Sequence, residues 1–269
     1  MLKAGFRRSS YFTISLCTMT RVILATLLIC NFFLQTASAN PASNRIVLAV
    51  PTQDWPPYII AGQDRAAGIA IDVFRQISQT NGYDLLIQRC SKKRAFVLLA
   101  QGQVDAWLTA REWNENPEQY LWSDPIMVSE DVLVTRQDSS VVFTSIEDLF
   151  GKTIGTLKYY VYPQLEPYFA SGAIKRMDAR GDRAMLEMVH LRRTDAAIIN
   201  RWVALWKMKK HADLNSADFT LSKQVVGSAE YCVMFSPDRN WEPFIAVFNA
   251  GLDKMKQTGR FDEIISKYR

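Results

Sequence analysis

Residues 45–51 read Arg-Ile-Val-Leu-Ala-Val-Pro, and this stretch sets the fold class of the chain. An apolar run closed by a proline is typical of a strand that is buried on both faces of a sheet. Ile71, Phe74 and Ile77 follow at helical spacing, and Asn81-Gly82 marks the end of that helix. A buried strand followed by an amphipathic helix predicts the first unit of an α/β fold.

The same alternation of β-rich and helical patterns continues to the end of the chain. The patterns predict strands at 85–87, 104–109, 131–135, 196–199 and 224–235, a loop and strand over 149–155, and helices at 94–101, 185–191, 244–255 and 261–268. No internal repeat, low-complexity run or second apolar span interrupts them. The apolar stripes of the last two helices are expected to be core packing.

Residues 1–39 have the order of a secretory signal peptide. They contain four basic residues and no acid, then an apolar run from Val22, and they close on the small-residue pattern Ala37-Ser38-Ala39. The alternative is a membrane anchor, but the apolar core is shorter than the roughly 20 residues that span a bilayer. We expect export to the periplasm and cleavage after Ala39. A second start at Met19 leaves open whether 1–18 are translated.

Charge and histidine content exclude several classes of site. The leader takes four of the 32 Lys+Arg, so the remaining 28 face 27 Asp+Glu and the net charge is about +1. No concentrated basic face with interleaved aromatics is left for nucleic acid. His190 and His211 lack the spacing of metal ligands, so no metal site and no cofactor are expected.

Cys90 and Cys232 are the cysteines that remain after the leader. An oxidising compartment permits a disulfide between them. The sequence gives no distance between them, so a disulfide and two buried free thiols both stay open.

Six motifs occur in a fixed order, and together they resemble the family-three bacterial extracellular solute-binding proteins, best known for binding polar amino acids. The resemblance covers 45–269. The motifs are Asp54-Trp55-Pro56-Pro57-Tyr58, Gly68-Ile69-Ala70-Ile71-Asp72-Val73, Gln101-Gly102-Gln103-Val104-Asp105-Ala106, Trp122-Ser123-Asp124-Pro125, Asp148-Leu149-Phe150-Gly151-Lys152-Thr153-Ile154-Gly155 and Thr258-Gly259-Arg260-Phe261-Asp262-Glu263-Ile264. Each motif alone is weak, but their order and separations are specific.

The resemblance implies a two-lobed, type II periplasmic-binding-protein-like α/β fold. Two crossing hinge strands would join the lobes, and a small solute would bind in the cleft between them. Lobe one would comprise 44–134 and 226–269, and lobe two 135–225. Such clefts close by a hinge, because the ligand contacts both lobes in the closed state.

The resemblance also places candidate ligand-binding residues. Trp55 stands where the family places a ring that stacks on the solute, with Asp54 before it and Tyr58 behind it. The alternative for Trp55 is packing at the lobe edge. Thr109 and Ala110 follow a strand at which the family offers hydroxyl and backbone groups.

Two arginines are candidate carboxylate clamps. Arg94 stands where a subgroup of the family carries an arginine at the cleft, and a guanidinium grips a carboxylate with two parallel hydrogen bonds. The alternative for Arg94 is a solvated helix charge. Arg111 lies one step beyond Ala110 and is a second candidate.

Three departures alter the family's usual amino-acid grip. Asn116 occupies the place of an arginine, and Asn200 the place of an aspartate that holds the ammonium group. The sequence 159–162, Tyr-Tyr-Val-Tyr, replaces a glycine-threonine turn, so Tyr160 and Tyr162 are candidate contacts. A small polar solute, amino-acid-like or an organic acid, is therefore expected, and an anionic or aromatic one is favoured.

Three functions are compatible with these residues. The first is a monomeric binding protein that delivers its ligand to an inner-membrane ABC permease, and the second is a ligand sensor for a membrane receptor. The third is an enzyme on the same fold, a dehydratase or a lytic transglycosylase, with Asp54 and Glu112 as candidate acids. No nucleophile motif supports the third function, so we predict that the chain is not an enzyme.

Overall fold

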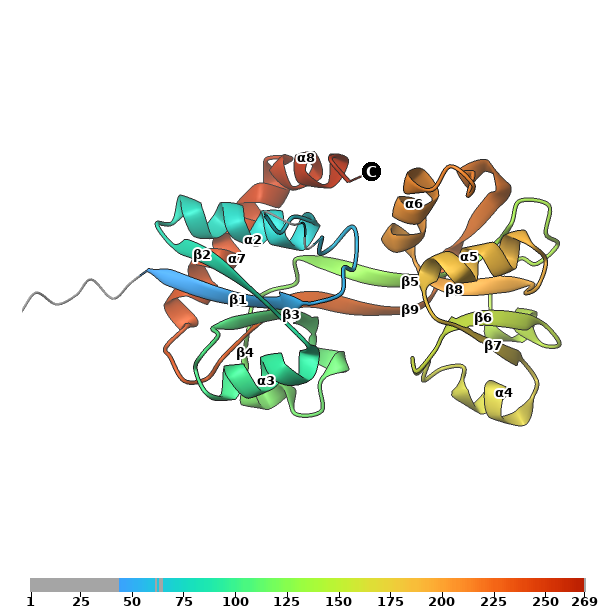
Figure 1. Ribbon diagram of the computed structural model, residues 1–269, viewed down its shortest axis with the longest axis horizontal. Helices are drawn as coiled ribbons and strands as arrows, with labels where there is room; N and C mark the ends of the chain where they lie inside the picture. The colour runs from blue at the N-terminus through green and yellow to red at the C-terminus, as the bar shows by residue number, and fades with distance from the viewer. Residues whose placement is uncertain (1–43, 61, 63–64, 269) are drawn as a thin grey trace, which may run out of the picture. The chain divides into compact units, whose positions relative to one another are not determined.

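The computed structural model describes residues 44–60, 62 and 65–268 (Figure 1). The predicted leader, 1–39, lies outside the described residues. In the part of the chain that is described, no helix is both long and apolar enough to cross a membrane.

One mixed sheet runs through the described chain, in the order β2-β1-β3-β9-β5-β8-β6-β7, with β4 paired to β9. The strands are β1 (Arg45–Pro51), β2 (Asp84–Cys90), β3 (Ala106–Ala110), β4 (Leu121–Trp122), β5 (Met127–Arg136), β6 (Thr153–Leu157), β7 (Lys175–Ala179), β8 (Ala196–Asn200) and β9 (Phe219–Phe235). β1 lies between parallel neighbours β2 and β3, which explains its continuous apolar run.

The strands β5 and β9 belong to both halves of this sheet. The end of β9, Tyr231–Phe235, pairs with β3, whereas its earlier part, Phe219–Tyr231, pairs with β5. β5 in turn pairs with β8. A first half (β2, β1, β3) and a second half (β8, β6, β7) are thus joined by two long antiparallel strands (Figure 1).

The predicted two-lobed α/β fold with two joining strands is therefore confirmed. The predicted lobe limits at 134–135 and 225–226 fall inside β5 and β9, and they stay predictions.

Helices cover both faces of the sheet. The helices are α2 (Ile69–Thr80), α3 (Lys92–Ala100), α4 (Glu166–Ser171), α5 (Asp182–His190), α6 (Arg201–Lys210), α7 (Glu242–Gln257) and α8 (Arg260–Ser266). One apolar cluster packs α2, α5, α6, α7 and α8 against one face. On the other face, α3 covers the first half and the segment around α4 covers the second.

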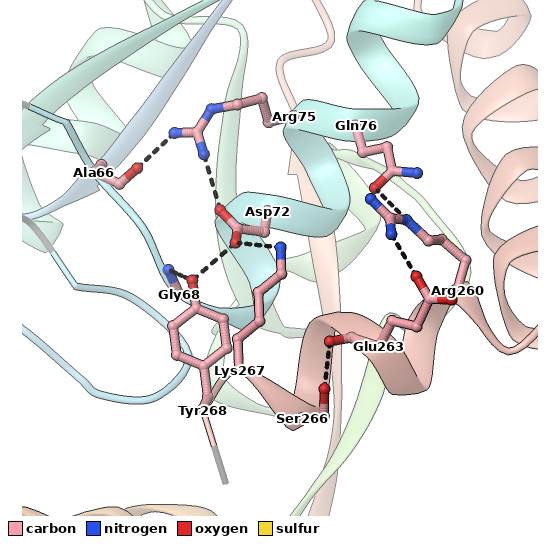
Figure 2. Close-up of polar contacts among 10 residues, drawn as sticks. All are labelled: Ala66, Gly68, Asp72, Arg75, Gln76, Arg260, Glu263, Ser266, Lys267 and Tyr268. Carbon is pink, nitrogen blue, oxygen red and sulfur yellow. Dashed lines mark hydrogen bonds and ion pairs between the residues drawn. The ribbon is translucent and has the colours of Figure 1, made fainter.

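The loop before α2 is held in place by Gly68 and by Tyr268 of the last turn of the described chain (Figure 2). Gly68 has φ +113°, and a Cβ there would lie 2.4 Å from the carbonyl oxygen of Tyr58. The Tyr268 hydroxyl accepts the Gly68 N–H at 2.8 Å and donates to Asp72 Oδ2 at 2.8 Å. Arg75 donates to Asp72 Oδ1 at 2.9 Å. The sequence motif at 68–73 therefore ties the loop after Tyr58 to the end of the chain.

Cys90 and Cys232 are two buried free thiols. Cys90 pairs with Pro51 on β1, and Cys232 pairs with Thr109 on β3. The cysteines therefore lie on the outer two of four adjacent strands, about 14 Å apart at the usual strand spacing. This separation is too large for a disulfide. Burial raises the pKa of Cys232 to about 12, so its thiol is protonated and unreactive.

Some element limits differ from the sequence prediction. β9 begins at Phe219 and not near 224, because two irregularities let a polar segment stay paired with β5. α5 begins at Asp182, three residues earlier than predicted. α6 was not predicted, since its sequence, Arg-Trp-Val-Ala-Leu-Trp-Lys-Met-Lys-Lys, mixes charges into its apolar face.

Gly68→Ala is expected to destabilise the protein strongly, because it combines a strained φ with a clash against backbone at Tyr58. Gly82→Ala is the matched control: Gly82 has φ +75° but no atom within 4 Å of an added Cβ. We expect Gly82→Ala to cost about 1–2 kcal/mol and Gly68→Ala distinctly more, measured by urea unfolding. Equal losses for the two variants would show that the close approach at Gly68 is not significant.

Candidate functional site

Four aromatic rings gather where β1 and β3 end, next to the point at which β9 passes from β5 to β3. Trp55 stacks on Tyr58, with ring centroids 4.2 Å apart and planes at 17°. Tyr231 of β9 packs edge-on against both rings, at 5.3 and 5.6 Å. Trp113, in the short helix Arg111–Trp113, contacts Trp55 at 5.9 Å. We call Trp55, Tyr58, Trp113 and Tyr231 the aromatic cluster.

Local hydrogen bonds set the position of Trp55. Its backbone N–H donates to the carbonyl of Ile59 at 2.9 Å, and its backbone carbonyl accepts from the Ile59 N–H at 3.0 Å. This tight turn brings Tyr58 under the indole. Trp55 is partly buried, whereas Tyr58 is completely buried. Tyr58 therefore supports one face of the Trp55 ring and exposes no surface of its own to a solute.

Asn200, which the sequence resemblance aligned with an aspartate, is buried, and its side chain makes four hydrogen bonds. Its Oδ1 accepts from the Tyr58 hydroxyl at 3.0 Å and from the N–H groups of Trp202 and Val203 at 3.1 and 3.2 Å. Its Nδ2 donates to Ser129 Oγ at 3.0 Å. Asn200 thus caps the N-terminus of α6 and links Tyr58 to β5.

An acid that the sequence analysis did not select lies directly opposite Asn200. Asp131 on β5 pairs with Asn200 on β8, so the two side chains leave the same face of the sheet. A bulge in the β5–β9 pairing falls between Asp131 and Val132. Burial, followed by the charge of Asp182, raises the pKa of Asp131 to about 6. Asp131 is therefore a partly buried carboxylate for which ionisation is unfavourable.

Asp182 is the second unselected acid and stands at the start of α5. Burial raises its pKa, while the charge of Lys207 and the Asp182 N–H act in the opposite direction. Among the described residues, no ion pair within 4.0 Å includes the carboxylate of Asp131 or Asp182. We call Asp131 and Asp182 the carboxylate pair. A bulge next to one acid and an unrecognised helix start at the other explain why neither was identified from sequence.

The two candidate tyrosines of the second half have different environments. Tyr162 is buried; its hydroxyl accepts the N–H of Leu157 at 3.2 Å, so it has a packing role. Tyr160 is 57% exposed. Desolvation, followed by the charges of Asp182 and Asp131, raises the pKa of Tyr160. Tyr160 is therefore within the electrostatic range of the carboxylate pair, and Tyr162 contacts the core.

Thr109 and Ala110 are the last two residues of β3, whereas the sequence placed them after the strand, and both are buried. The Asn114 Nδ2 donates to the carbonyl of Ala110 at 2.5 Å and to Thr109 Oγ1 at 3.5 Å. The Asn114 Oδ1 atom is buried and has no hydrogen-bond partner in the described part of the chain. The Ala110 carbonyl and the Thr109 hydroxyl are thus already hydrogen-bonded to Asn114.

Three charged candidates lie on the surface. Arg94 is exposed in the first turn of α3. Arg111 is exposed, and its guanidinium lies 5.3 Å from the Trp122 ring. Asp54 lies 3.8 Å from Arg89. For the described residues, the structure gives no hydrogen bond or ion pair that joins Arg94 or Arg111 to the aromatic cluster, and their ligand role stays a prediction.

A separate cavity of about 560 Å³ opens between α2 and α8. It is lined by Asp72, Arg75, Arg260 and Lys267, among others, and includes none of the predicted site residues. Its acid is already held by Arg75, Tyr268 and Lys267 (Figure 2). The aromatic cluster and the carboxylate pair are therefore the better candidate site.

Comparison with known proteins agrees with the fold and the motifs. The arginine-binding extracellular protein ArtP of Bacillus subtilis is 22% identical over 236 residues, which cover 86% of this chain and 89% of that protein. A putative amino-acid ABC transporter-binding protein, PatH of Vibrio harveyi, is 24% identical over 214 residues, 79% of this chain and 84% of that protein.

A solved structure shows the same fold. Substrate-binding domain 2 of Lactococcus lactis GlnP, in an open conformation, superposes with a TM-score of 0.67 at 18% identity, covering 85% of this chain and 97% of that one. The family model of the bacterial extracellular solute-binding proteins, family 3, matches residues 47–269. With that match over most of its length, the chain belongs to the family-3 bacterial extracellular solute-binding proteins.

Proposed function

We propose that this protein captures a small amino-acid-like solute with a cationic group, which the carboxylate pair binds beside the aromatic cluster. The observation that carries the proposal is the pair itself: Asp131 and Asp182 are partly buried, burial raises the pKa of both, the charge of Asp182 adds to the rise at Asp131, and neither has an ion-pair partner among the described residues. A bound cation would offset their repulsion and form charge-assisted hydrogen bonds. An organic acid would add to the repulsion.

Lys207 does not replace such a ligand. Its charge lowers the pKa of Asp182, but it is not among the causes of the Asp131 shift, and it is a single charge against two. Asp131 also raises the pKa of Tyr58 and Tyr162, so its field extends to rings on both sides of the crossing strands. The site therefore has an excess of negative potential.

The aromatic cluster supplies the second part of the recognition. A flat cation such as a guanidinium binds the face of an indole by a cation–π interaction. One face of Trp55 is occupied by Tyr58, so Trp55 offers at most one face to a solute. A few charge-assisted hydrogen bonds and one ring contact are sufficient for a micromolar ligand, which corresponds to about −8 kcal/mol.

The relatives support the chemical class of the ligand. The Bacillus subtilis protein is named for arginine, a solute with two cationic groups. The Vibrio harveyi protein is named as a transporter-binding protein, which supports delivery to an ABC permease. Because the family is extracellular, we propose periplasmic function after cleavage of residues 1–39. Arg94 or Arg111 would hold the solute's carboxylate.

Catalysis is not part of the proposal. The family consists of binding proteins. Of the two acids considered for an enzyme, Asp54 and Glu112 are both exposed. An exposed acid lacks the burial that tunes a catalytic pKa.

Thermal-shift and calorimetric titration with L-arginine, agmatine, L-glutamate and citrate should separate the ligand classes. We expect L-arginine to raise the melting temperature and agmatine, which lacks the carboxylate, to do so more weakly, because binding to the native state stabilises it by mass action. Glutamate and citrate should give no shift. Tighter binding of citrate than of arginine would contradict the proposal.

The matched variants for that titration are Asp131→Asn, Asp182→Asn and Asp253→Asn. Asp253 is an exposed acid on α7, so it controls for a general loss of negative charge. Each substitution in the carboxylate pair should weaken arginine binding at least tenfold, and Asp253→Asn should leave it unchanged. If all three variants weakened arginine binding equally, the loss would come from long-range electrostatics and not from direct binding by the carboxylate pair.

The stability of the ligand-free protein should depend on pH through Asp131. Its pKa is raised to about 6 from 3.8, so the native state binds the proton more tightly than the unfolded state. The ionised form therefore destabilises the protein above pH 6, and this penalty is relieved as the pH falls toward 4. Asp131→Asn should be more stable than the wild type at pH 7.5, by on the order of 1–3 kcal/mol.

Urea unfolding at pH 7.5 and pH 4.5 tests this difference. The advantage of Asp131→Asn should shrink at the lower pH, and Asp253→Asn should show no such dependence. A variant that is less stable than the wild type at pH 7.5 would mean that Asp131 is held by a partner and is not available to a ligand.

A further inference from the structure

Outside the β5–β9 pair, a buried hydrogen bond joins the two halves of the sheet. The Tyr58 hydroxyl donates to Asn200 Oδ1 at 3.0 Å, across 142 positions of the chain. Tyr58 lies between β1 and α2 in the first half, and Asn200 ends β8 in the second. Tyr58 is completely buried, and Asn200 is 6% exposed. Burial holds the pKa of Tyr58 well above its usual value, so the hydroxyl stays a donor.

The second-half end of this bond is rigid. Two backbone N–H groups of α6 and the Ser129 hydroxyl fix the Asn200 amide, so it cannot turn toward a solute without losing one of them. Asn200 is therefore not free to hold the ligand, although it occupies the family's ligand-binding position. What it holds is Tyr58.

The first-half end of the bond carries the aromatic cluster. Tyr58 is stacked under Trp55, and Tyr231 packs edge-on against both. The Tyr58 hydroxyl also interacts with the Ser129 side chain on β5, whereas the Tyr231 hydroxyl donates within the first half, to the Leu108 carbonyl at 3.4 Å. The orientation of Tyr58, and with it the support of Trp55, thus depends on a group in the second half.

We propose that Asn200 is a positioning residue that couples the aromatic cluster to the second half of the molecule through Tyr58. The bond fixes Trp55 on the side of the crossing where the carboxylate pair lies, and it raises the population of the arrangement that is ready for the ligand. The effect on affinity rests on the proposed function, but the coupling itself is present in the ligand-free protein.

The absence of a charge at position 200 fits this role. Asn200 is directly opposite Asp131, whose pKa is already raised by one neighbouring carboxylate. An aspartate would keep the acceptor for Tyr58 and the cap of α6 but would place a third negative charge in the site. The amide retains the positioning contacts and leaves the charge on β5.

Tyr58→Phe and Tyr231→Phe form a matched pair for the test. Each removes one buried hydroxyl and leaves the ring, but only Tyr58→Phe removes a bond between the halves. Spin labels at Lys93→Cys in α3 and Lys175→Cys in β7, both exposed, report the distance between the halves without ligand. The buried native thiols stay unlabelled. In parallel, ¹⁹F NMR of 5-fluorotryptophan protein follows Trp55, assigned with Trp55→Phe.

Tyr58→Phe should broaden or shift the label distance and move the Trp55 resonance, and Tyr231→Phe should change neither beyond a small shift. Where L-arginine binds the wild type, Tyr58→Phe should weaken it about fivefold, the effect of one net hydrogen bond. If both variants behave alike in the ligand-free protein, the coupling is wrong. If the distances and resonance change but no solute binds, the coupling stands and the proposed function fails.

Discussion

The antiparallel pairing of β5 with β9 is the constraint on which the rest of the structure depends. Within the sheet, β9 pairs with the first half, β5 pairs with the second half, and the pairing of β9 with β5 links the two, so a displacement of one half relative to the other bends these strands. Their register is not uniform: β9 has extra residues opposite Asp131–Val132 and opposite Val132–Val134. Such bulges bend a strand and redirect its side chains. The irregular region is thus where the strands bend most easily. Asp131 lies at its edge, so the bulge also sets the direction of the Asp131 side chain.

The polar groups at this crossing divide into satisfied and unsatisfied sets. Asn200, Ser129 and the Tyr58 hydroxyl satisfy one another and the start of α6. Among the described residues, Asp131 and Asp182 have no ion-pair partner within 4.0 Å. A buried charge without a partner lowers stability, and proteins retain such groups mainly at functional sites. The satisfied set therefore links the two halves beside the crossing, and the two carboxylates would attract a cation there.

The sequence predicted what depends on local pattern. The buried run at 45–51, the Gly68 motif and the closing helices are confirmed because apolar periodicity and one obligatory glycine determine them locally. The candidate site was predicted less completely. Trp55 and Tyr58 were found through a motif, but Asp131 became visible only with its register opposite Asn200. Asp182 was missed because the helix start depends on an extended Gly181, which carries no capping side chain. Whether Cys90 and Cys232 form a disulfide also depends on the order of the strands in the sheet, and apolar patterns do not give that order.

A crystal structure of the protein grown with L-arginine tests the central claim most directly. We expect a cationic group within about 3 Å of the carboxylates of Asp131 and Asp182, with its plane or stem against Trp55 and with Asn200 still bonded to Tyr58. Density for arginine elsewhere, with both carboxylates facing solvent, would contradict it. So would a ligand whose carboxylate, and not its cationic group, points toward Asp131.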